Sequence, residues 1–488
     1  MQLKSLIRDV NSARLVGKWT EEWEGLQVEG LSDDSRFVKK GEVFFCRRGQ
    51  NYDTHEFALD AQKRGAVAVV CEREVQVDIP QILVDDSRCA MAQMAATYYG
   101  YPSEKLKIVG ITGTNGKTTV SYMLRSILQA DGKKVGVIGT LGIYYGRKMI
   151  APELTTPDPI FLQKTLADMV QEGMEYVVME VSAHALYYKK DASIRYCACI
   201  FTNFTQDHLD FFGDMQEYAN AKKQLFSAKK CPVCILNGDD ALGREIAECR
   251  EDGAVFYGLD TPCDAFAIVE QETLESLDFI VNVMDDLCSV QMKMAGMHNV
   301  YNALAAATCA RVLGVPMIKV KKGLTEITCV KGRLEMVAEY NGARIFVDFA
   351  HTPDGLEKSL KALKKHVSGR LICLFGCGGN RDKSKRPLMG ETVAKTADFA
   401  VLTSDNPRYE DPMDIICAIE WGYRKHSNRY AIVPEREKAL EYALESLQGG
   451  DVLLVAGKGG ERYQEIMGIK YMLSDDDIIK TWIGGRQK

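Results

Sequence analysis

The stretch from residue 108 to residue 130 decides the fold. Residues 108–119 read IVGITGTNGKTT, and residues 120–130 read VSYMLRSILQA. An apolar run leads into a glycine-rich turn, and Gly116-Lys117-Thr118 opens a segment with the apolar spacing of a helix. Glycines let backbone N–H groups close on phosphate oxygens, a lysine reaches the outer phosphates, and a helix N-terminus favours an anion. The pattern predicts a strand, a phosphate-binding loop and a helix that bind a nucleoside triphosphate.

The loop departs from the usual GxxxxGK[ST] spacing, because Ile111 stands where the first glycine belongs. The alternative is a glycine turn between a strand and a helix that contains a lysine by chance. The apolar run before the loop and the helical pattern after it favour phosphate binding. We predict that the nucleotide contacts seven residues of the loop, namely Gly113, Thr114, Asn115, Gly116, Lys117, Thr118 and Thr119.

Strands and helices alternate on the carboxyl side of this loop, which predicts an α/β fold with a mainly parallel sheet. The expected strands are 135–138, 176–179, 198–201 and 233–236. Residues 254–295 alternate instead like antiparallel strands. A further doubly wound α/β region, without a phosphate loop, carries expected strands at 371–375, 399–402 and 452–455.

The first hundred residues mix short strands with helices and end at Tyr101-Pro102-Ser103, a plausible linker. We therefore expect three domains. They are a mixed α/β domain at 1–104, a central P-loop ATPase-like domain with a parallel sheet at 105–335, and a Rossmann-like domain at 336–488.

Composition excludes several classes of protein. The 488 residues carry 61 Lys and Arg against 67 Asp and Glu, a net charge of −6 that gives no support to nucleic-acid binding. No apolar run approaches the roughly 18 residues of a membrane span. Fifteen cysteines at irregular spacing, without an export signal, favour reduced thiols and a cytoplasmic protein. Cys231-Pro-Val-Cys234 supplies only two of four zinc ligands, so we interpret this pair as structural.

Three polar residues follow expected strands or lie near them. Glu180 ends the strand 176–179, where a Mg²⁺ ligand should lie beside a phosphate loop, although an ordinary strand-end acid is the alternative. His208 lies in the polar loop after the strand 198–201, which favours contact with a metal or a phosphate. Lys222 lies on an expected helix at 215–226, and from the residues alone it is a solvated surface lysine.

Taken together, the motifs resemble the Mur ligases, the ATP-dependent amino-acid-adding enzymes of peptidoglycan synthesis. The matches run in order from about residue 34 to residue 464. They include GTNGKTT (113–119), EVS (180–182), TNFTQDHLD (202–210), HNVYNALAA (298–306), KGRLE (331–335), VDFAHTPD (347–354) and FGCGGNRDKSKRPLM (375–389).

The resemblance implies that the N-terminal domain binds UDP, the central domain binds ATP, and the C-terminal domain brings the amino acid. It also implies the chemistry. The D-glutamate carboxylate of a UDP-muramoyl dipeptide attacks the γ-phosphate of ATP, and an amine takes the acyl phosphate to give an amide, ADP and phosphate. We expect the chain to act as a monomer on these small-molecule substrates, with neither a nucleic acid nor a membrane as partner.

The resemblance also implies roles for individual residues. Lys117 and a Mg²⁺ held by Thr118 would serve the phosphates, Glu180 and His208 would hold a second Mg²⁺, and Lys222 aligns with a lysine that CO₂ carbamylates. The residues implied around adenine, ribose and phosphate are Asn299, Asn302, Arg333 and Asp348. Those implied for the UDP-dipeptide are Ser35, Thr155, Thr156, Ser182 and Lys190.

The turn Asp405-Asn406-Pro407-Arg408 indicates which amino acid is added. Diaminopimelate ends in an ammonium and a second carboxylate, whereas lysine has the ammonium alone. An arginine can pair with the extra carboxylate through two hydrogen bonds. The turn resembles the diaminopimelate signature of the family, and Arg381, Gly457 and Glu461 match its remaining positions, with Glu461 suited to the ammonium.

Four positions depart from the family pattern and put substrate-side details in doubt. Gly460 replaces a usual His, Tyr188 and Lys190 replace a usual Gln and Arg, and Ala183 replaces a usual Ser. Three alternatives stay open at this point. The first is a lysine-adding ligase, the second is a relative of folylpolyglutamate synthetase, and the third is an ATPase-driven switch or binding module. The stereoisomer of diaminopimelate is open as well.

Overall fold

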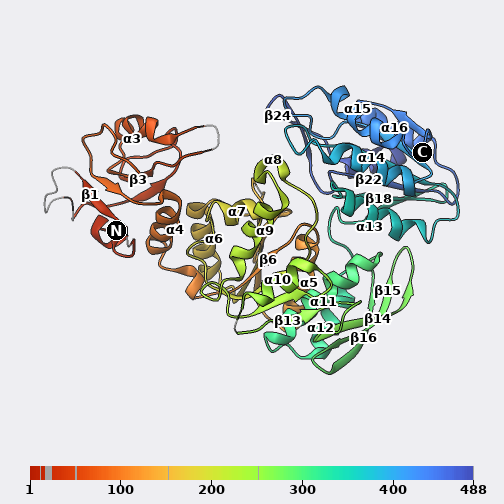
Figure 1. Ribbon diagram of the computed structural model, residues 1–488, viewed down its shortest axis with the longest axis horizontal. Coiled ribbons are helices and arrows are strands. Elements are labelled where there is room, and N and C mark those ends of the chain that lie inside the picture. Colours follow the sequence, from red (N-terminus) through yellow and green to blue (C-terminus); the bar gives the residue numbers. More distant parts are fainter. Residues whose placement is uncertain are drawn as a thin grey trace. The chain divides into compact units, whose positions relative to one another are not determined.

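The computed structural model describes residues 1–486 apart from 11, 17–22, 24, 50, 51, 152 and 251, and it has the expected mixed α/β character (Figure 1). The chain divides into two compact units. The first unit comprises Met1–Gly110, Lys134–Ala198 and Ser227–Pro232. The second comprises Ile111–Lys133, Cys199–Phe226 and Val233–Lys488. None of the described helices combines the length and the apolar character that a membrane crossing requires.

The first unit begins with a five-stranded sheet. Its order is β1 (Arg14–Val16), β5 (Gln81–Leu83), β4 (Ala68–Cys71), β3 (Glu42–Phe45) and β2 (Gly30–Ser32), and only β1 is antiparallel to its neighbour. The alternation of a strand sends Val43 and Phe45 to one core and Phe44 to the other. The first core also contains α1 (Leu3–Ile7) and α4 (Ser87–Tyr98), and the second contains α3 (Ala58–Lys63).

The same unit contains most of β6 (Lys107–Thr112), followed in the sheet order by β10 (Tyr176–Glu180), β7 (Val135–Gly139), β8 (Gly142–Tyr145) and β9 (Lys148–Ile150). Strands β10 and β7 are parallel and buried along their whole length, as the continuous apolar runs predict. The remaining elements are α6 (Pro159–Gln171), α7 (Ala183–Tyr187) and the start of β11 (Tyr196–Phe201).

The second unit contains the helix after the phosphate loop, α5 (Lys117–Ala130), and a run of strands. From β11 the order continues with β12 (Cys234–Asn237), β13 (Val255–Tyr257), β14 (Ala265–Glu272), β15 (Leu277–Val283) and β16 (Asp286–Met292). The last three are antiparallel, which confirms the prediction for this stretch. The helices are α8 (Leu209–Phe212), α9 (Met215–Lys223), α10 (Ala241–Glu248), α11 (Met297–Val312) and α12 (Met317–Glu326).

Helices α5 and α12 cross very closely. A Cβ atom at Gly323 of α12 would lie 2.4 Å from the Cα of Ile127. The hydroxyl of Ser126 also donates a hydrogen bond of 2.7 Å to the carbonyl of Gly323. This contact fixes the axis of α5, and therefore the direction in which its N-terminus faces the phosphate loop.

The C-terminal part of the second unit is a six-stranded doubly wound sheet. Its order is β17 (Glu335–Tyr340), β18 (Ala343–Asp348), β22 (Val452–Ala456), β19 (Leu371–Phe375), β20 (Phe399–Leu402) and β21 (Tyr430–Ile432), with β17 alone antiparallel. One face packs on α13 (Pro353–Lys364), α14 (Lys385–Thr396) and α15 (Pro412–Tyr423). The other face packs on α16 (Arg436–Glu445) and α17 (Asp475–Arg486), and a hairpin of β23 (Tyr463–Ile466) and β24 (Ile469–Met472) precedes α17.

A buried ion pair joins α16 to α17. Arg436 and Asp475 have fully buried side chains and form two parallel hydrogen bonds, Nε to Oδ1 at 2.8 Å and Nη2 to Oδ2 at 2.7 Å. Arg436 also donates 3.0 Å to the carbonyl of Ala456, at the end of β22. Since a buried charge without its partner is costly, this pair holds both helices against one end of the sheet.

We predict that Arg436→Met lowers the free energy of unfolding by about 3–5 kcal/mol, because Asp475 stays buried without a partner. Urea unfolding of the full chain, followed by its tryptophan fluorescence, measures the change. The matched control is Lys438→Ala, which breaks an exposed pair with Glu435 and should cost less than about 1 kcal/mol. A similarly small loss for Arg436→Met would contradict the importance of the buried pair.

Candidate active site

The phosphate loop has the glycines that its backbone requires. Gly113 and Gly116 have φ values of +147° and +88°, which residues with side chains rarely adopt. A Cβ atom at Gly113 would lie 1.9 Å from Oγ1 of Thr202, and one at Gly116 would lie 2.5 Å from Oδ1 of Asn302. The side chain of Lys117 folds over the loop and donates to the carbonyls of Gly113 at 2.8 Å and Thr114 at 2.9 Å. The Lys117 ammonium is therefore held at the mouth of the loop.

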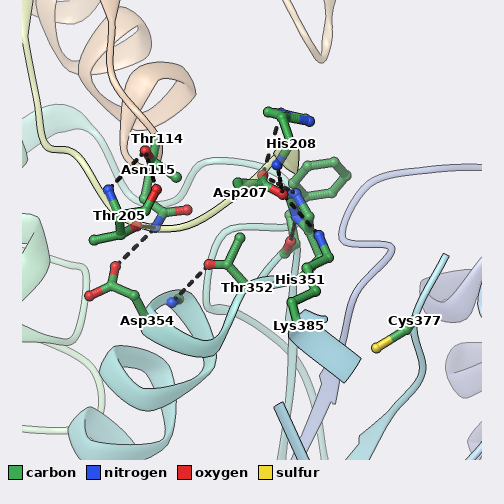
Figure 2. A network of polar contacts seen from close by, with 12 residues as sticks. Thr114, Asn115, Thr205, Asp207, His208, His351, Thr352, Asp354, Cys377 and Lys385 are labelled. Atoms are coloured by element: carbon green, nitrogen blue, oxygen red, sulfur yellow. Dashed lines mark hydrogen bonds and ion pairs between the residues drawn. The ribbon is translucent and has the colours of Figure 1, made fainter. Parts of the chain in front are cut away.

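The segment after β11 braces this loop. Asn203 accepts hydrogen bonds from the N–H of Thr114 at 2.8 Å and from the N–H of Asn115 at 2.9 Å. Thr202 donates 2.6 Å to the carbonyl of Asn115. On its other side, Asn115 donates 2.9 Å to the carboxylate of Asp354 on α13 (Figure 2). The loop is thus fixed from both the central and the C-terminal segments of the second unit.

The four residues expected around the nucleotide lie beside the loop or next to one another. Arg333 donates 2.9 Å to the hydroxyl of Thr118, at the first turn of α5. Asn302 donates 3.0 Å to Asn299, one turn earlier on α11. Asp348, at the end of β18, accepts from the N–H groups of two neighbouring segments. Burial raises the pKa of Asp348 despite the opposing effect of the Arg333 cation.

Lys222 is buried, so its interpretation as a solvated lysine is wrong. It is 1% exposed on α9, and its Nζ lies 4.4 Å from the ring centroid of Tyr218. A helical pattern alone does not show that aromatic residues cover this face of α9. Burial and the nearby cation of Lys117 lower the pKa of Lys222 far below its usual value. A lowered pKa favours the neutral amine, which is the form that reacts with CO₂.

Asp207 lies at the centre of a network next to His208 (Figure 2). One carboxylate oxygen lies 2.9 Å from Nζ of Lys385 and accepts from the N–H of His208 at 2.9 Å. The other lies 3.4 Å from Nε2 of His208 and 3.5 Å from Nε2 of His351. Burial alone would raise the pKa of Asp207, but the hydrogen bond from His351 and the Lys385 cation hold it well below its usual value. Asp207 is therefore a carboxylate.

The sequence interpretation gave no role to Asp207, His351 or Lys385. All three lie inside motifs that carry the resemblance. Asp207 directly precedes the predicted His208, His351 lies three residues after Asp348, and Lys385 lies four residues after Arg381. The available signal was an acid beside the predicted His208 and a histidine after the strand 343–348. Their partners come from distant segments, so the sequence did not show the pairing.

The first unit has a polar cluster of its own at the end of β10. Glu180 is completely buried, and its carboxylate accepts from the N–H of Thr140 at 2.9 Å and from the Thr140 hydroxyl at 3.1 Å. The hydroxyl of Thr156 donates a hydrogen bond of 2.9 Å to the carbonyl of Glu180 and accepts one of 3.0 Å from the N–H of Ser182. Thr155 lies 3.2 Å from the Thr140 hydroxyl. The structure thus brings together four predicted residues: Glu180, Thr155, Thr156 and Ser182.

Lys190 lies in an alternating chain of charges within the same unit. It pairs with Asp158 at 2.8 Å, Asp158 lies 3.9 Å from Arg47, and Arg47 pairs with Asp33 at 2.7 Å. Ser35 is half-buried in the turn that follows β2, two residues after Asp33. Among the departures from the family pattern, Tyr188 packs under Arg88, whose guanidinium carbon lies 4.2 Å from the ring centroid.

The chemistry of the donors limits how Mg²⁺ fits. Among the described residues, no three His, Cys, Asp or Glu side chains lie close enough to form a metal cage. Mg²⁺ that also binds phosphates needs only one or two oxygen ligands from the protein. The Thr118 hydroxyl and the Glu180 carboxylate each have an oxygen of the type that Mg²⁺ binds. Unmodified Lys222 is an amine, and it becomes an oxygen ligand only as a carbamate.

The Asp405–Arg408 turn follows β20 and is held by a network of polar side chains. Oδ1 of Asn406 accepts from Nζ of Lys458 at 3.1 Å, and Nδ2 of Asn406 donates 3.0 Å to Glu461. Lys458 also pairs with Glu461 at 3.0 Å and is completely buried. Burial alone would raise the pKa of Asp405, but the cations of Lys458 and Arg436 lower it.

The remaining predicted residues of this group surround the turn. Gly457 has a φ of +107°, and a Cβ atom there would lie 2.6 Å from the carboxylate of Asp405. A Cβ atom at Gly379 would lie 1.9 Å from the carbonyl of Pro407. Burial and the nearby cation of Arg408 lower the pKa of Arg381. Two guanidinium groups and the Glu461 carboxylate therefore gather at one turn, whereas Lys458 was not predicted.

Comparison with known proteins agrees with this geometry. Family models match three parts of the chain: "Mur ligase family, catalytic domain" at residues 27–99, "Mur ligase middle domain" at 111–310, and "Mur ligase, glutamate ligase domain" at 332–459.

Curated relatives match along nearly the whole chain. The UDP-N-acetylmuramoyl-L-alanyl-D-glutamate–2,6-diaminopimelate ligase of Caldanaerobacter subterraneus subsp. tengcongensis is 42% identical over 95% of this chain and 96% of its own. A ligase with the same name from Clostridium acetobutylicum is 41% identical over 99% of both chains. A solved structure with that name is 30% identical, with a TM-score of 0.68 over 97% of this chain and 98% of its own. The chain belongs to the Mur ligase family.

Proposed function

We propose that this protein is the ATP-dependent ligase that adds meso-diaminopimelate to UDP-N-acetylmuramoyl-L-alanyl-D-glutamate during peptidoglycan synthesis. The observation that carries the choice of amino acid is the gathering of Arg381, Arg408 and Glu461 at one turn. The relatives that are about 40% identical carry the name of this activity, and they cover nearly the whole chain.

The distal end of diaminopimelate matches this turn in charge. Its second carboxylate suits a guanidinium, which can give two parallel hydrogen bonds, and its ammonium suits Glu461. Lysine has no carboxylate at this end, so it would make no ion pair with Arg381 or with the Nη2 donors of Arg408. Loss of these hydrogen bonds gives the site a means of rejecting lysine. Asp405, Asn406, Pro407 and Gly457 shape the turn.

The chemistry begins with two anions. The D-glutamate carboxylate attacks the γ-phosphate of ATP and releases ADP, and the amine of diaminopimelate then attacks the acyl carbon and releases phosphate. Lys117, Arg333 and the N–H groups at the start of α5 reduce the repulsion between the reactants. Asn299, Asn302 and Asp348 orient the nucleotide. Positioning of the two substrates provides most of the remaining catalysis.

We propose Mg²⁺ ligands by family resemblance. Thr118 and the phosphates would hold one ion, and Glu180, His208 and carbamylated Lys222 would hold a second. Bound Mg²⁺ supplies positive charge at the phosphates.

The UDP-dipeptide would contact Ser35, Thr155, Thr156, Ser182 and Lys190. We also propose domains at 1–104, 105–335 and 336–488, and a monomer in the cytoplasm, where a reducing environment suits a chain with fifteen cysteines at irregular spacing.

A panel of amino acids, assayed with ATP and the UDP-muramoyl dipeptide, tests the proposed function. We expect phosphate release with meso-diaminopimelate and a kcat/KM for lysine that is lower by about 100-fold or more, since lysine has no second carboxylate to pair with the arginines. Arg408→Ala should raise the KM for diaminopimelate by about 30-fold or more and leave the KM for ATP unchanged. The control is Arg424→Ala, an exposed arginine of the same domain. Equal use of lysine, or phosphate release without any amine, would refute the assignment.

A second prediction concerns Lys222. Lys222→Ala should reduce kcat by about 1,000-fold or more, and short carboxylic acids such as acetate should restore part of the activity by replacing the carbamate. The neighbouring variant Lys223→Ala, which removes a pair with Glu245, is the control and should keep its activity. Full activity of Lys222→Ala, or an inactive variant that no carboxylic acid improves, would exclude the carbamate.

A further inference from the structure

The β23–β24 hairpin is joined to the Asp405–Arg408 turn through the backbone of Arg408. The N–H of Arg408 donates 3.0 Å to the carbonyl of Glu465, and the carbonyl of Arg408 accepts 2.7 Å from the N–H of Met467. Arg408 therefore pairs with Ile466 as if it were one residue of a third strand. Arg408 has a φ of +52°, in the left-handed region, so the chain changes direction away from the hairpin at this residue.

The side chain of Arg408 is held on the same hairpin. Its Nε lies 3.1 Å from Oε2 of Glu465, and its Nη1 donates 2.8 Å to the carbonyl of Gly379. Among the described residues, Nη2 has no hydrogen-bond acceptor. Hydrogen bonds thus hold the guanidinium through Nε and Nη1, whereas the N–H groups of Nη2 stay available for a ligand.

The surroundings of Arg408 make this restraint necessary. Arg381 is close enough for its cation to repel that of Arg408. A Cβ atom at Gly378 would lie 3.0 Å from Nη1 of Arg408 and 3.6 Å from Cγ of Arg381. Without an anion, two guanidinium groups at this distance would move apart. Glu465 supplies that anion from the side of the hairpin, so Arg408 keeps its place before the substrate arrives.

The Arg408–Glu465 pair is not a major part of the core. The two side chains are 19% and 24% exposed, so water partly screens their attraction, and the pair contributes less to stability than a fully buried pair would. Glu465 also lies outside the set of residues to which we have given a role in the proposed reaction. Its contact with Arg408 therefore calls for an explanation other than folding.

We infer that Glu465 is a positioning residue for amino-acid selection: by holding Nε of Arg408, it directs the Nη2 edge of the guanidinium toward the second carboxylate of the substrate. This inference rests on the proposed function. Glu465 does not contact the reacting atoms, and it acts only through Arg408. A glutamine at this position would keep a hydrogen-bond acceptor for Nε, whereas an alanine would not.

Steady-state kinetics of the full chain with ATP, the UDP-muramoyl dipeptide and diaminopimelate tests the inference. Glu465→Ala should raise the KM for diaminopimelate about tenfold, with kcat and the KM for ATP within about twofold of wild type. Glu465→Gln keeps an acceptor for Nε but loses the negative charge, so its KM for diaminopimelate should lie between those of wild type and Glu465→Ala. In an Arg408→Ala background, Glu465→Ala should cause no further change, as expected for a residue that acts through Arg408.

Met472→Ala, on the exposed strand β24 of the same hairpin, is the matched control and should behave as wild type. An unchanged KM for diaminopimelate in Glu465→Ala, or the same tenfold loss in the Arg408→Ala background, would overturn the positioning role alone. A wild-type chain that couples no diaminopimelate would overturn the proposed function and this inference together.

Discussion

Repulsion between a carboxylate and a triphosphate is the constraint on which the organisation of the second unit depends. We propose that the phosphate loop meets it with backbone N–H groups, with Lys117 and with Arg333, whose guanidinium reaches the first turn of α5. Gly113 and Gly116 let neighbouring segments approach so closely that any side chain there would collide. Cations and close backbone approach at one end of α5 are what the joining of two anions requires.

The same region shows how the C-terminal segments are connected to the loop. Lys385, the first residue of α14, forms a buried pair with Asp207, and Asp354 of α13 accepts from Asn115 (Figure 2). Both helices start at the carboxyl end of the C-terminal sheet, where ligands of doubly wound folds bind. The amino-acid turn belongs to this sheet. These contacts therefore fix the phosphate loop relative to the sheet that carries the Asp405–Arg408 turn, which we propose binds the amino acid.

Local sequence patterns predicted the local structure well and the long-range pairs poorly. The strand, loop and helix around Gly116 and the antiparallel strands between 254 and 295 are confirmed, because each depends on periodicity and on turn residues. Burial of Lys222 was missed, since a helix does not reveal which other segments cover it. Lys458 and Glu465 were missed for a similar reason, because their partners lie more than fifty residues earlier in the chain.

The central claim is that a carboxylate is activated by phosphorylation before an amine captures it. The most direct measurement uses a UDP-muramoyl dipeptide whose D-glutamate side-chain carboxylate is labelled with ¹⁸O, together with ATP and diaminopimelate. If the carboxylate attacks the γ-phosphate, one labelled oxygen leaves with the phosphate when the amide forms, and mass spectrometry of the released phosphate will detect it. Released phosphate without the label, from a reaction that still forms the amide, would contradict the account.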